Sequence, residues 1–546
     1  MIPQPPPAIV APATSSGLEP LIRRFQTDEQ GLERFYDLPF SRSVRARKRK
    51  LWSETRMRID ALRWDSLDTS ARVDALLLDN YLTHQEAQEK LAEKREAELA
   101  PLVPYAEKLI ALEEARIRVE KPDPERWAAI LTEIANDAKK APRETSPVIA
   151  LRASRSIDEL NGILSRWRRH YEGFHPLVSW WCRKPAEDAQ KALSEQSRYL
   201  RENVAKIKGE DSDPLIGDPI GREALMSDLA YERIPYTPEE LVKIAEKEFA
   251  WCEVELKKAT RDMGLGDDTK AALARVKTKA VSPGEQDQLV ATQAREAIAF
   301  LKKNDLVTIE PLCEETWRVD MLDREGQKVL PFAAYGGQKM LVAYPLESMD
   351  DATKHMSLRA NNEHFTHIVT PHELIPGHHL QGYMAERYRP YRRMFNTPFL
   401  VEGWSLYWEM QLWDKNWARG PEDRIGMLFW RMHRCARIIV SLGFHLGTMT
   451  PPQMIDFLVD RVGHERFSAT SEVRRFVGDG YSPLYQCAYM IGGLQIRALQ
   501  KELSKQSLKS FHDAVLHEGP IPIDLIRVAL KGDKPARNQP YWKFDN

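Results

Sequence analysis

The feature that most constrains this chain is the segment 372–381, which reads His-Glu-Leu-Ile-Pro-Gly-His-His-Leu-Gln. Five of the 14 histidines of the chain lie between His364 and His379. Imidazoles concentrated in one short segment are typical of a metal site rather than of a solvated surface. Pro376 lacks a backbone N–H donor, and Gly377 tolerates backbone angles that other residues avoid. A helix in this segment therefore has to be interrupted.

The pair His372-Glu373 is similar to the start of the motif H-E-x-x-H, in which two histidines bind Zn²⁺ and the glutamate activates a metal-bound water. Here position i+4 is a proline, and the next histidine, His378, would lie roughly 9 Å further along an unbroken helix. Two ligands of one zinc ion, with Zn–N bonds of about 2.0–2.1 Å, cannot be that far apart. We therefore predict a local bulge at residues 375–377 that brings His378 to the metal, with His379 as the alternative ligand.

A third ligand is predicted at Glu402, in the segment 401–410 (Val-Glu-Gly-Trp-Ser-Leu-Tyr-Trp-Glu-Met). The segment has a helical pattern and is rich in apolar and aromatic residues, so an unpaired carboxylate there would be costly and a metal would neutralise it. Glu409 lies seven residues on, on the same side of the helix, and is predicted to accept a hydrogen bond from a ligand histidine. The sequence thus predicts one Zn²⁺ per chain, bound by His372, His378 and Glu402.

The remaining parts of a hydrolytic site follow from the chemistry. Glu373 is predicted to be the general base that takes a proton from water. Hydrolysis of a peptide also develops an oxyanion that needs hydrogen-bond donors beyond the metal, and Tyr489 and His445 are the best candidates. Arg474 and Arg475 are predicted to bind a substrate carboxylate, which would make the enzyme an exopeptidase or dipeptidase.

Several blocks in the second half of the chain resemble a known family. They are His-Glu-x-x-Pro-Gly-His-His-Leu-Gln at 372–381, Glu-Gly-Trp-x-Leu-Tyr-x-Glu at 402–409, Arg434-x-x-Arg437 followed by Gly443-Phe444-His445, Glu472-Val473-x-Arg475, and Gln486-x-x-Tyr489-x-x-Gly492. In this order they resemble the zincin-like domain-of-unknown-function family 885 (DUF885). The resemblance implies a mostly helical, gluzincin-type metallopeptidase fold in exported or cytoplasmic bacterial proteins.

Two positions depart from the pattern expected of that family. Ser441 stands where an aspartate is expected between the arginine pair and His445. This change removes a carboxylate that could contact a neighbouring side chain or a substrate amine. Ser405 stands where alanine is commoner, and we expect that change to be silent.

Two other functions fit part of the pattern. Two histidines and one carboxylate also describe a non-haem iron enzyme, but such sites usually lie on β-rich scaffolds and do not need Glu373. A non-catalytic helical binding or scaffold protein that retains a structural metal would not need Glu373 either. We therefore expect a zinc metallopeptidase, a hydrolase whose partner is a peptide or small amide substrate.

The composition argues against several other classes of partner. With 79 Lys and Arg against 80 Asp and Glu, the net charge is −1 at pH 7, which favours neither nucleic acid nor an anionic membrane. The longest apolar run, 438–446, is far shorter than the ~20 residues of a transmembrane helix, so no integral membrane segment is predicted. No C-x-x-C spacing or disulfide framework is indicated by the five cysteines, Cys182, Cys252, Cys313, Cys435 and Cys487.

Helical patterns dominate the chain, and the predicted fold class is mainly α, with two lobes. Residues 1–17 are predicted to be a disordered Pro/Ala-rich tether without the features of a signal peptide, so periplasmic and cytoplasmic locations both remain open. Residues 18–208 are predicted to form an N-terminal helical lobe, 209–222 a linker, and 223–546 a zincin-like catalytic region. Short apolar runs predict a small antiparallel sheet near the active site, at about residues 305–345. The sequence does not indicate an oligomeric state.

Overall fold

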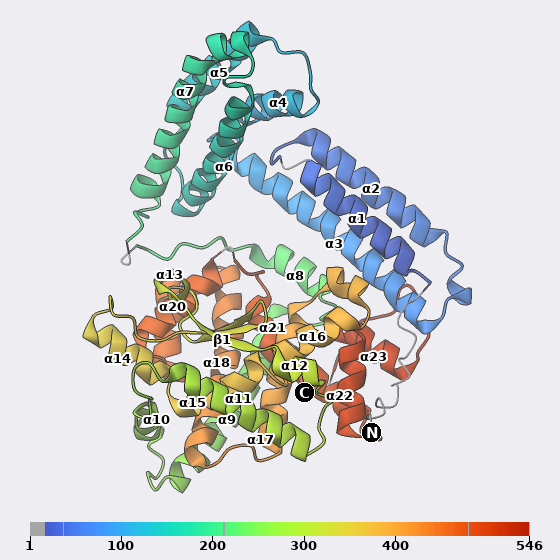
Figure 1. The fold of residues 1–546 in the computed structure, drawn as a ribbon, viewed down its shortest axis with the longest axis vertical. Coiled ribbons are helices and arrows are strands. Elements are labelled where there is room, and N and C mark those ends of the chain that lie inside the picture. Colours follow the sequence, from blue (N-terminus) through green and yellow to red (C-terminus); the bar gives the residue numbers. More distant parts are fainter. Residues whose placement is uncertain (1–16, 36–37, 211–212, 479, 545–546) are drawn as a thin grey trace, which may run out of the picture. The chain divides into compact units, whose positions relative to one another are not determined.

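The computed structural model in Figure 1 describes residues 17–35, 38–210, 213–478 and 480–544. Helices make up most of these residues, and the strands are short, so the predicted mainly-α class is confirmed. The tether predicted for residues 1–17 lies outside the described residues except for Gly17. None of the described helices is long and apolar enough to cross a membrane, as the sequence predicted.

The chain divides into two compact units. The smaller unit consists of Phe25–Asp60 and Leu82–Asp218 within the described residues. The larger unit consists of the described residues up to Arg24, those from Ala61 to Tyr81, and those from Pro219 onward. The division based on the sequence differs, because it assigned the whole of 18–208 to one N-terminal lobe.

Local packing explains why residues 61–81 belong to the larger unit. Helix α3 (Thr69–Leu99) begins in this segment, and its residues Ala71 and Ala75 form a small buried cluster with Leu18. Asp74, on the same helix, accepts a hydrogen bond from the buried Arg392 at 2.7 Å. A buried ion pair that loses one partner is strongly destabilising, so this contact holds the segment in place.

The smaller unit is built of helices (Figure 1). Its helices, besides parts of α1 (Glu19–Phe35) and α3, are α2 (Arg42–Asp60), α4 (Ala106–Ile117), α5 (Pro124–Lys140), α6 (Pro147–Tyr171) and α7 (Pro176–Tyr199), the last continued by a π-helical turn (Leu200–Val204). A large cluster of buried apolar residues lies among α4 to α7 and the adjoining ends of α2 and α3. Helices α5 and α6 begin with proline after a capping side chain, Asp123 or Ser146. Trp127 and Trp167 pack edge to face in the core, with ring centroids 5.5 Å apart.

The larger unit contains the small sheet and the remaining helices. The helices are α8 (Gly221–Tyr231), α9 (Pro238–Asp262), α10 (Thr269–Lys277), α11 (Gln286–Lys303), α12 (Pro311–Glu315), α13 (Arg324–Gln327), α14 (Asp351–Ala360), α15 (Glu363–Glu373), α16 (His378–Arg387), α17 (Pro398–Asp414), α18 (Pro421–His445), α19 (Pro451–Phe457), α20 (Arg466–Val477), α21 (Tyr485–Glu502), α22 (Leu508–His517) and α23 (Ile523–Lys531). Short 3₁₀ turns lie at Trp64–Ser66 and Pro390–Phe395, and a π-helical turn at Leu458–Val462.

The sheet is mixed, which corrects the prediction of an antiparallel sheet. Its strands β1 (Arg318–Met321), β2 (Ala333–Gly336) and β3 (Lys339–Val342) are ordered β1-β3-β2. Strand β3 is antiparallel to β2 but parallel to β1. The turn at Gly337-Gln338, with φ of 58° and 66°, reverses the chain between β2 and β3, as in tight hairpins. The longer connection through α13 has already reversed it once, so β3 runs in the direction of β1.

Three glycines allow helices α17 and α21 to approach backbone to backbone. A Cβ atom added to Gly403 would lie 2.6 Å from the Cα atom of Gly492, and one added to Gly492 would lie 1.9 Å from the carbonyl oxygen of Phe399. A Cβ atom on Gly493 would contact Leu406 at 3.3 Å. Larger residues would therefore separate the two helices. This close packing places the start of α17 beside the first turns of α21.

Candidate metal centre

The structure replaces the predicted bulge with a complete break between two helices. Helix α15 ends at Glu373, and α16 begins anew at His378. The Gly377 N–H donates to the carbonyl oxygen of Pro371 at 3.0 Å, which folds the turn back against the end of α15. A Cβ atom at Gly377 would lie 1.7 Å from the carbonyl oxygen of His372, so only glycine permits this turn.

Helix α17 holds the turn through two side chains. The Trp404 indole N–H donates to the carbonyl oxygen of Pro376 at 2.8 Å. The Ser405 hydroxyl lies 3.0 Å from the carbonyl oxygen of His372 and 3.3 Å from Nδ1 of His378. Ser405 thus contacts both sides of the helix break. These contacts argue against the expectation that this serine is silent, because an alanine would lack both of them.

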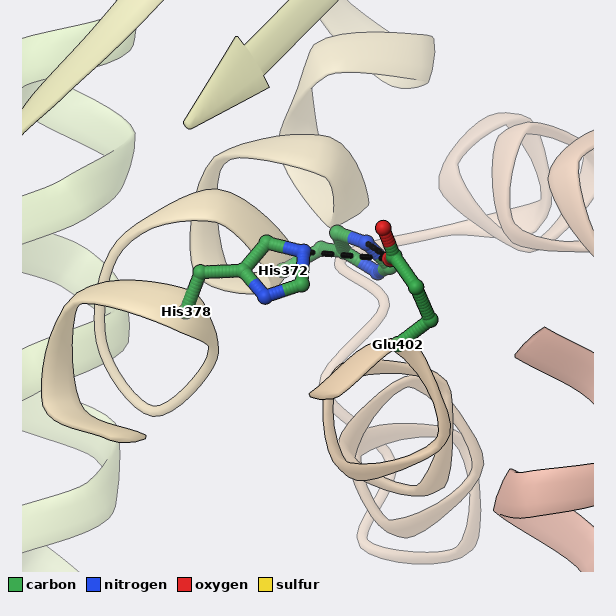
Figure 2. A group of neighbouring side chains, drawn as sticks. All are labelled: His372, His378 and Glu402. Atoms are coloured by element: carbon green, nitrogen blue, oxygen red, sulfur yellow. Dashed lines mark ion pairs between the residues drawn. The ribbon is translucent and has the colours of Figure 1, made fainter. Parts of the chain in front are cut away.

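The break brings together the three predicted ligands, His372, His378 and Glu402 (Figure 2). Nε2 of His378 lies 3.2 Å, and Nε2 of His372 3.6 Å, from Oε2 of Glu402. Ligands about 2.1 Å from a tetrahedral zinc ion lie about 3.4 Å from one another, so this spacing fits one ion. All three side chains are buried, and in the described part of the chain they form the one such group of His, Cys, Asp and Glu. Two imidazoles and a carboxylate are also a common donor set for zinc.

The neighbouring histidine, kept as an alternative ligand, has both ring nitrogens engaged elsewhere. His379 Nε2 lies 2.8 Å from the carbonyl oxygen of Cys313, and its Nδ1 lies 3.1 Å from the Tyr335 hydroxyl. One nitrogen therefore donates and the other accepts, and burial lowers the pKa of His379. The structure thus places His378, not His379, in one group with His372 and Glu402.

Glu409 lies where the sequence predicted, behind the first ligand. Its Oε1 is 2.6 Å from Nδ1 of His372 and 3.3 Å from an Nη atom of Arg434. Because Nδ1–H donates to this carboxylate, Nε2 of His372 is left to face Glu402. Arg434 in turn fixes the Glu409 carboxylate. The orientation of the His372 ring therefore depends on both of these side chains.

Glu402 and Glu409 stabilise a positive charge on the side chain between them, His372. Burial alone would lower the pKa of His372, but hydrogen bonds with Glu402 and Glu409 raise it to about 9. Burial would raise the pKa of Glu402, but His378 and His372 hold it well below its usual value. Without a metal, a proton on the imidazole serves as the required cation. Metal binding would displace that proton.

A cavity of about 550 Å³ opens onto the three ligands. Of the other predicted residues, Glu373, Tyr489 and Arg475 also line it. A carboxylate oxygen of Glu373 lies 4.0 Å from Nε2 of His378. The Tyr489 ring is nearly parallel to that of His372, at 13° and a centroid distance of 6.1 Å. The predicted ligands, base and oxyanion donor therefore share one cavity.

Comparison with known proteins assigns the chain to a family. Residues 26–530 match the model of DUF885, described as a bacterial protein of unknown function. The chain belongs to the DUF885 family. It is similar in structure to a putative lipoprotein of unknown function from Shewanella oneidensis, at 18% identity and TM-score 0.69 over 95% of this chain and 100% of that one.

A second similar structure is a putative lipoprotein from Colwellia psychrerythraea, at 17% identity and TM-score 0.52, covering 75% of this chain and 74% of that one. At these identities the likeness shows the fold alone. No curated protein matches the chain. The family predicted from the sequence blocks is thus confirmed.

The structure places two other predicted residues away from the cavity. Arg474 donates to the carbonyl oxygen of Lys328 at 3.1 Å and does not line the cavity. His445 is the last residue of α18, roughly 16 Å along the helix axis from Arg434, and is also absent from the lining. Ser441 is buried, with its hydroxyl 3.5 Å from the carbonyl oxygen of Pro483. The predicted roles of Arg474 and His445 are therefore corrected.

Sequence reasoning missed a tyrosine that contacts a ligand directly. The Tyr485 hydroxyl donates to Oε1 of Glu402, the carboxylate oxygen that does not face the histidines. Tyr485 lies one helical turn before Tyr489 on α21, and the two rings are 5.8 Å apart. The i, i+4 spacing of the two tyrosines was the available signal, since such residues share one face of a helix.

Sequence reasoning also missed a polar group beside the ligands. Two arginines of α18 face the Tyr489 ring, Arg437 at 4.0 Å and Arg434 at 4.7 Å from its centroid. His433 and Glu472 line the same cavity and lie 3.1 Å apart. Arg434, Arg437 and Glu472 stand in the family blocks. The i, i+3 spacing of the two arginines places them on one helix face, but nothing in the sequence indicates that Glu472 meets them.

Proposed function

We propose that this protein is a zinc-dependent peptidase that hydrolyses peptide or small amide bonds. The observation that carries the proposal is the position of Glu373, whose carboxylate lines the cavity beside the three convergent ligands. A site that only held a metal would not need it. A zinc ion bound to His372, His378 and Glu402 would lower the pKa of water and polarise a carbonyl group.

The residues around the ligands can perform the proton transfers of hydrolysis. The Glu373 carboxylate is suited to accept a proton from water in the cavity and to return it to the leaving amine. Its neighbour along the chain, His372, is held by Glu409, so base and ligand are fixed at the end of one helix. Such fixed geometry is what general-base catalysis requires.

Tyr489 is suited to stabilise the negative charge that develops on the carbonyl oxygen. Burial raises the pKa of its hydroxyl to about 12, so the group stays protonated and able to donate at neutral pH. The Tyr485 hydroxyl is already committed to Glu402. Tyr489 is therefore the donor of choice for the oxyanion.

The cavity also bears on the two alternative functions. A structural zinc site is closed by four protein ligands, whereas this group has three protein ligands beside a cavity of about 550 Å³. A non-haem iron site would use the same ligands but has no use for Glu373. Elemental analysis of the purified protein distinguishes iron from zinc, and the test below distinguishes an enzyme from a scaffold.

The test is digestion of a mixed peptide library by the zinc-loaded protein, with products read by mass spectrometry. On the peptides that are cleaved, Glu373→Gln should lower kcat by about 10²- to 10⁴-fold while zinc content is unchanged. Glu363→Gln is the matched control, because it makes the same change on the same helix outside the cavity lining. Wild-type turnover by Glu373→Gln, or no cleavage of any peptide, would refute the proposal.

A further inference from the structure

Three arginine side chains line one wall of the cavity: Arg434, Arg437 and Arg475. They are almost completely buried, with 6%, 1% and 10% of the side chains exposed. Buried charges are costly unless they are paired. The wall therefore needs negative partners, and their number decides what else it can bind.

Two carboxylates, Glu409 and Glu472, form ion pairs with these three arginines. Arg434 contacts Glu409 at 3.3 Å. Arg437 and Arg475 share a single carboxylate, Glu472, at 3.8 Å and 3.6 Å. Both of these distances are longer than a hydrogen bond. The more distant Glu402 and Glu373 also raise the pKa of Arg434. Among the described residues, Arg437 and Arg475 thus share one carboxylate, and neither is hydrogen-bonded to it.

The shared carboxylate is also engaged on its other side. His433 Nε2 lies 3.1 Å from Oε2 of Glu472, and His433 Nδ1 lies 2.9 Å from Nε2 of His464. Each histidine can thus donate once, in a chain from His464 through His433 to Glu472. Burial lowers the pKa of His433 to about 4 and that of His464 well below its usual value, so the two imidazoles add no charge to the wall. Arg437 and Arg475 therefore still share a single carboxylate.

Some donors of these guanidinium groups have no acceptor. Among the described residues, Nε of Arg475 and one Nη of Arg437 are buried without a hydrogen-bond partner. Another nitrogen of Arg475 donates to the Tyr489 hydroxyl at 3.3 Å. Two guanidinium groups that line a cavity, share one carboxylate and keep N–H donors without an acceptor are suited to bind a planar anion with two oxygens.

The distance from this wall to the predicted ligands limits how many residues can lie between the bound anion and the bond that is cleaved. Tyr489 spans the gap: its ring lies against His372, and its hydroxyl contacts Arg475. One or two residues of an extended peptide, at ~3.5 Å each, bridge a gap of one tyrosine side chain. The anion at this wall is therefore close in sequence to the bond at the metal.

We infer that the wall formed by Arg475 and Arg437 binds the free carboxylate at the C-terminus of a peptide, so that the enzyme removes one or two C-terminal residues. The inference rests on the proposed peptidase function and adds the substrate class. It also explains why Arg475 faces the cavity while its neighbour Arg474 is bonded to the backbone at Lys328.

The first test compares an N-acetylated peptide from the library digest with the same peptide ending in a carboxamide. Wild-type kcat/KM should favour the free acid by about 10- to 100-fold, the range expected for a charge-assisted pair. Arg475→Gln should lose most of this preference, because hydrolysis of the acid should fall by a larger factor than hydrolysis of the amide. Arg475→Lys keeps the charge but not the planar fork, so its preference for the acid should lie between those of the wild type and Arg475→Gln.

Arg474→Gln is the matched control, since it makes the same change at the adjacent position outside the cavity lining. It should retain the full preference for the acid. Equal hydrolysis of acid and amide by the wild type would overturn the inference. An equal loss on both substrates in Arg475→Gln would do the same, because it would assign the arginine to the reacting carbonyl or to folding.

The second test measures binding without hydrolysis. N-acetylphenylalanine should bind the zinc-loaded protein at least about tenfold more tightly than its carboxamide in titration calorimetry, and Arg475→Gln should abolish the difference. If the difference persists in Arg475→Gln, the carboxylate binds elsewhere, for example at the metal, and the inference is wrong. If it disappears as expected but no peptide is ever cleaved, the anion site stands and the peptidase proposal fails.

Discussion

The protein contains two buried clusters of the same composition, each with two histidines and one glutamate, and they behave differently. In the ligand cluster (His372, His378 and Glu402), both Nε2 atoms face the same carboxylate oxygen. In the arginine-side cluster (His433, His464 and Glu472), the histidines bond to each other and only His433 reaches the carboxylate. Composition and burial therefore do not define a metal site. What matters is whether the ring nitrogens converge.

The neighbours of each cluster explain the difference. In the ligand cluster, outer partners occupy the other ring nitrogens: Glu409 for His372 and Ser405 for His378. The inner nitrogens are then free to face an ion. In the arginine-side cluster, no outer carboxylate among the described residues contacts the histidines, and Arg437 and Arg475 supply the positive charge next to Glu472. We propose that the cation is a metal ion in the first cluster, whereas in the second it is a guanidinium pair.

The largest expected effect tests this contrast directly. His372→Ala and Glu402→Ala should each weaken zinc binding by more than the roughly 10- to 100-fold that loss of an outer partner causes, because each removes one of three protein ligands. His433→Ala should leave the zinc content of the purified protein unchanged. Elemental analysis with a zinc-chelator titration measures both. Full zinc occupancy in the first two variants, or loss of zinc in His433→Ala, would show that the clusters have been interpreted the wrong way round.

An intermediate effect is expected from the outer partner of His372. Glu409→Gln keeps an oxygen that can accept from Nδ1 but removes the charge that faces Arg434 and the imidazole. Zinc affinity should fall by about 10- to 100-fold, with the fold retained. Glu422→Gln, near the start of α18 and away from the cavity lining, is the matched control. Wild-type affinity in Glu409→Gln would mean that the ligand is oriented by packing alone.

The ligand cluster could be predicted because its determinants are local in the sequence. The Pro-Gly break lies between two of the ligands, and Glu402 with Glu409 follows on the next long helix. The predicted backbone between Glu373 and His378 was wrong, because the helix ends and a new one begins where a bulge was expected. Apolar periodicity cannot distinguish these two cases. The prediction also failed at His445, since an apolar run does not reveal how far along a helix the cavity extends.

The arginine-side cluster could not be predicted in the same way. Its members come from α18, α20 and the segment between α19 and α20, and only tertiary packing brings them together. Arg474 and Arg475 are equivalent in a sequence, but adjacent residues on a helix point about 100° apart, and just one of them faces the cavity. The mixed sheet was missed for a related reason, because strand direction depends on the connection between strands rather than on their apolar patterns.

The smallest expected effect concerns Ser405, the outer partner of His378. Its hydroxyl donates to the carbonyl oxygen of His372, so its oxygen can only accept from Nδ1–H of His378, which leaves Nε2 of that ring toward the metal. Ser405→Ala removes one modest hydrogen bond, of about 0.5–1.5 kcal/mol, and should weaken zinc binding by roughly 2- to 10-fold. Ser441→Ala, another buried serine outside the cavity lining, should leave the affinity unchanged. A zinc affinity equal to that of the wild type in Ser405→Ala would mean that the turn at Gly377 alone orients His378, and that an outer partner is needed only where, as at His372, it carries a charge.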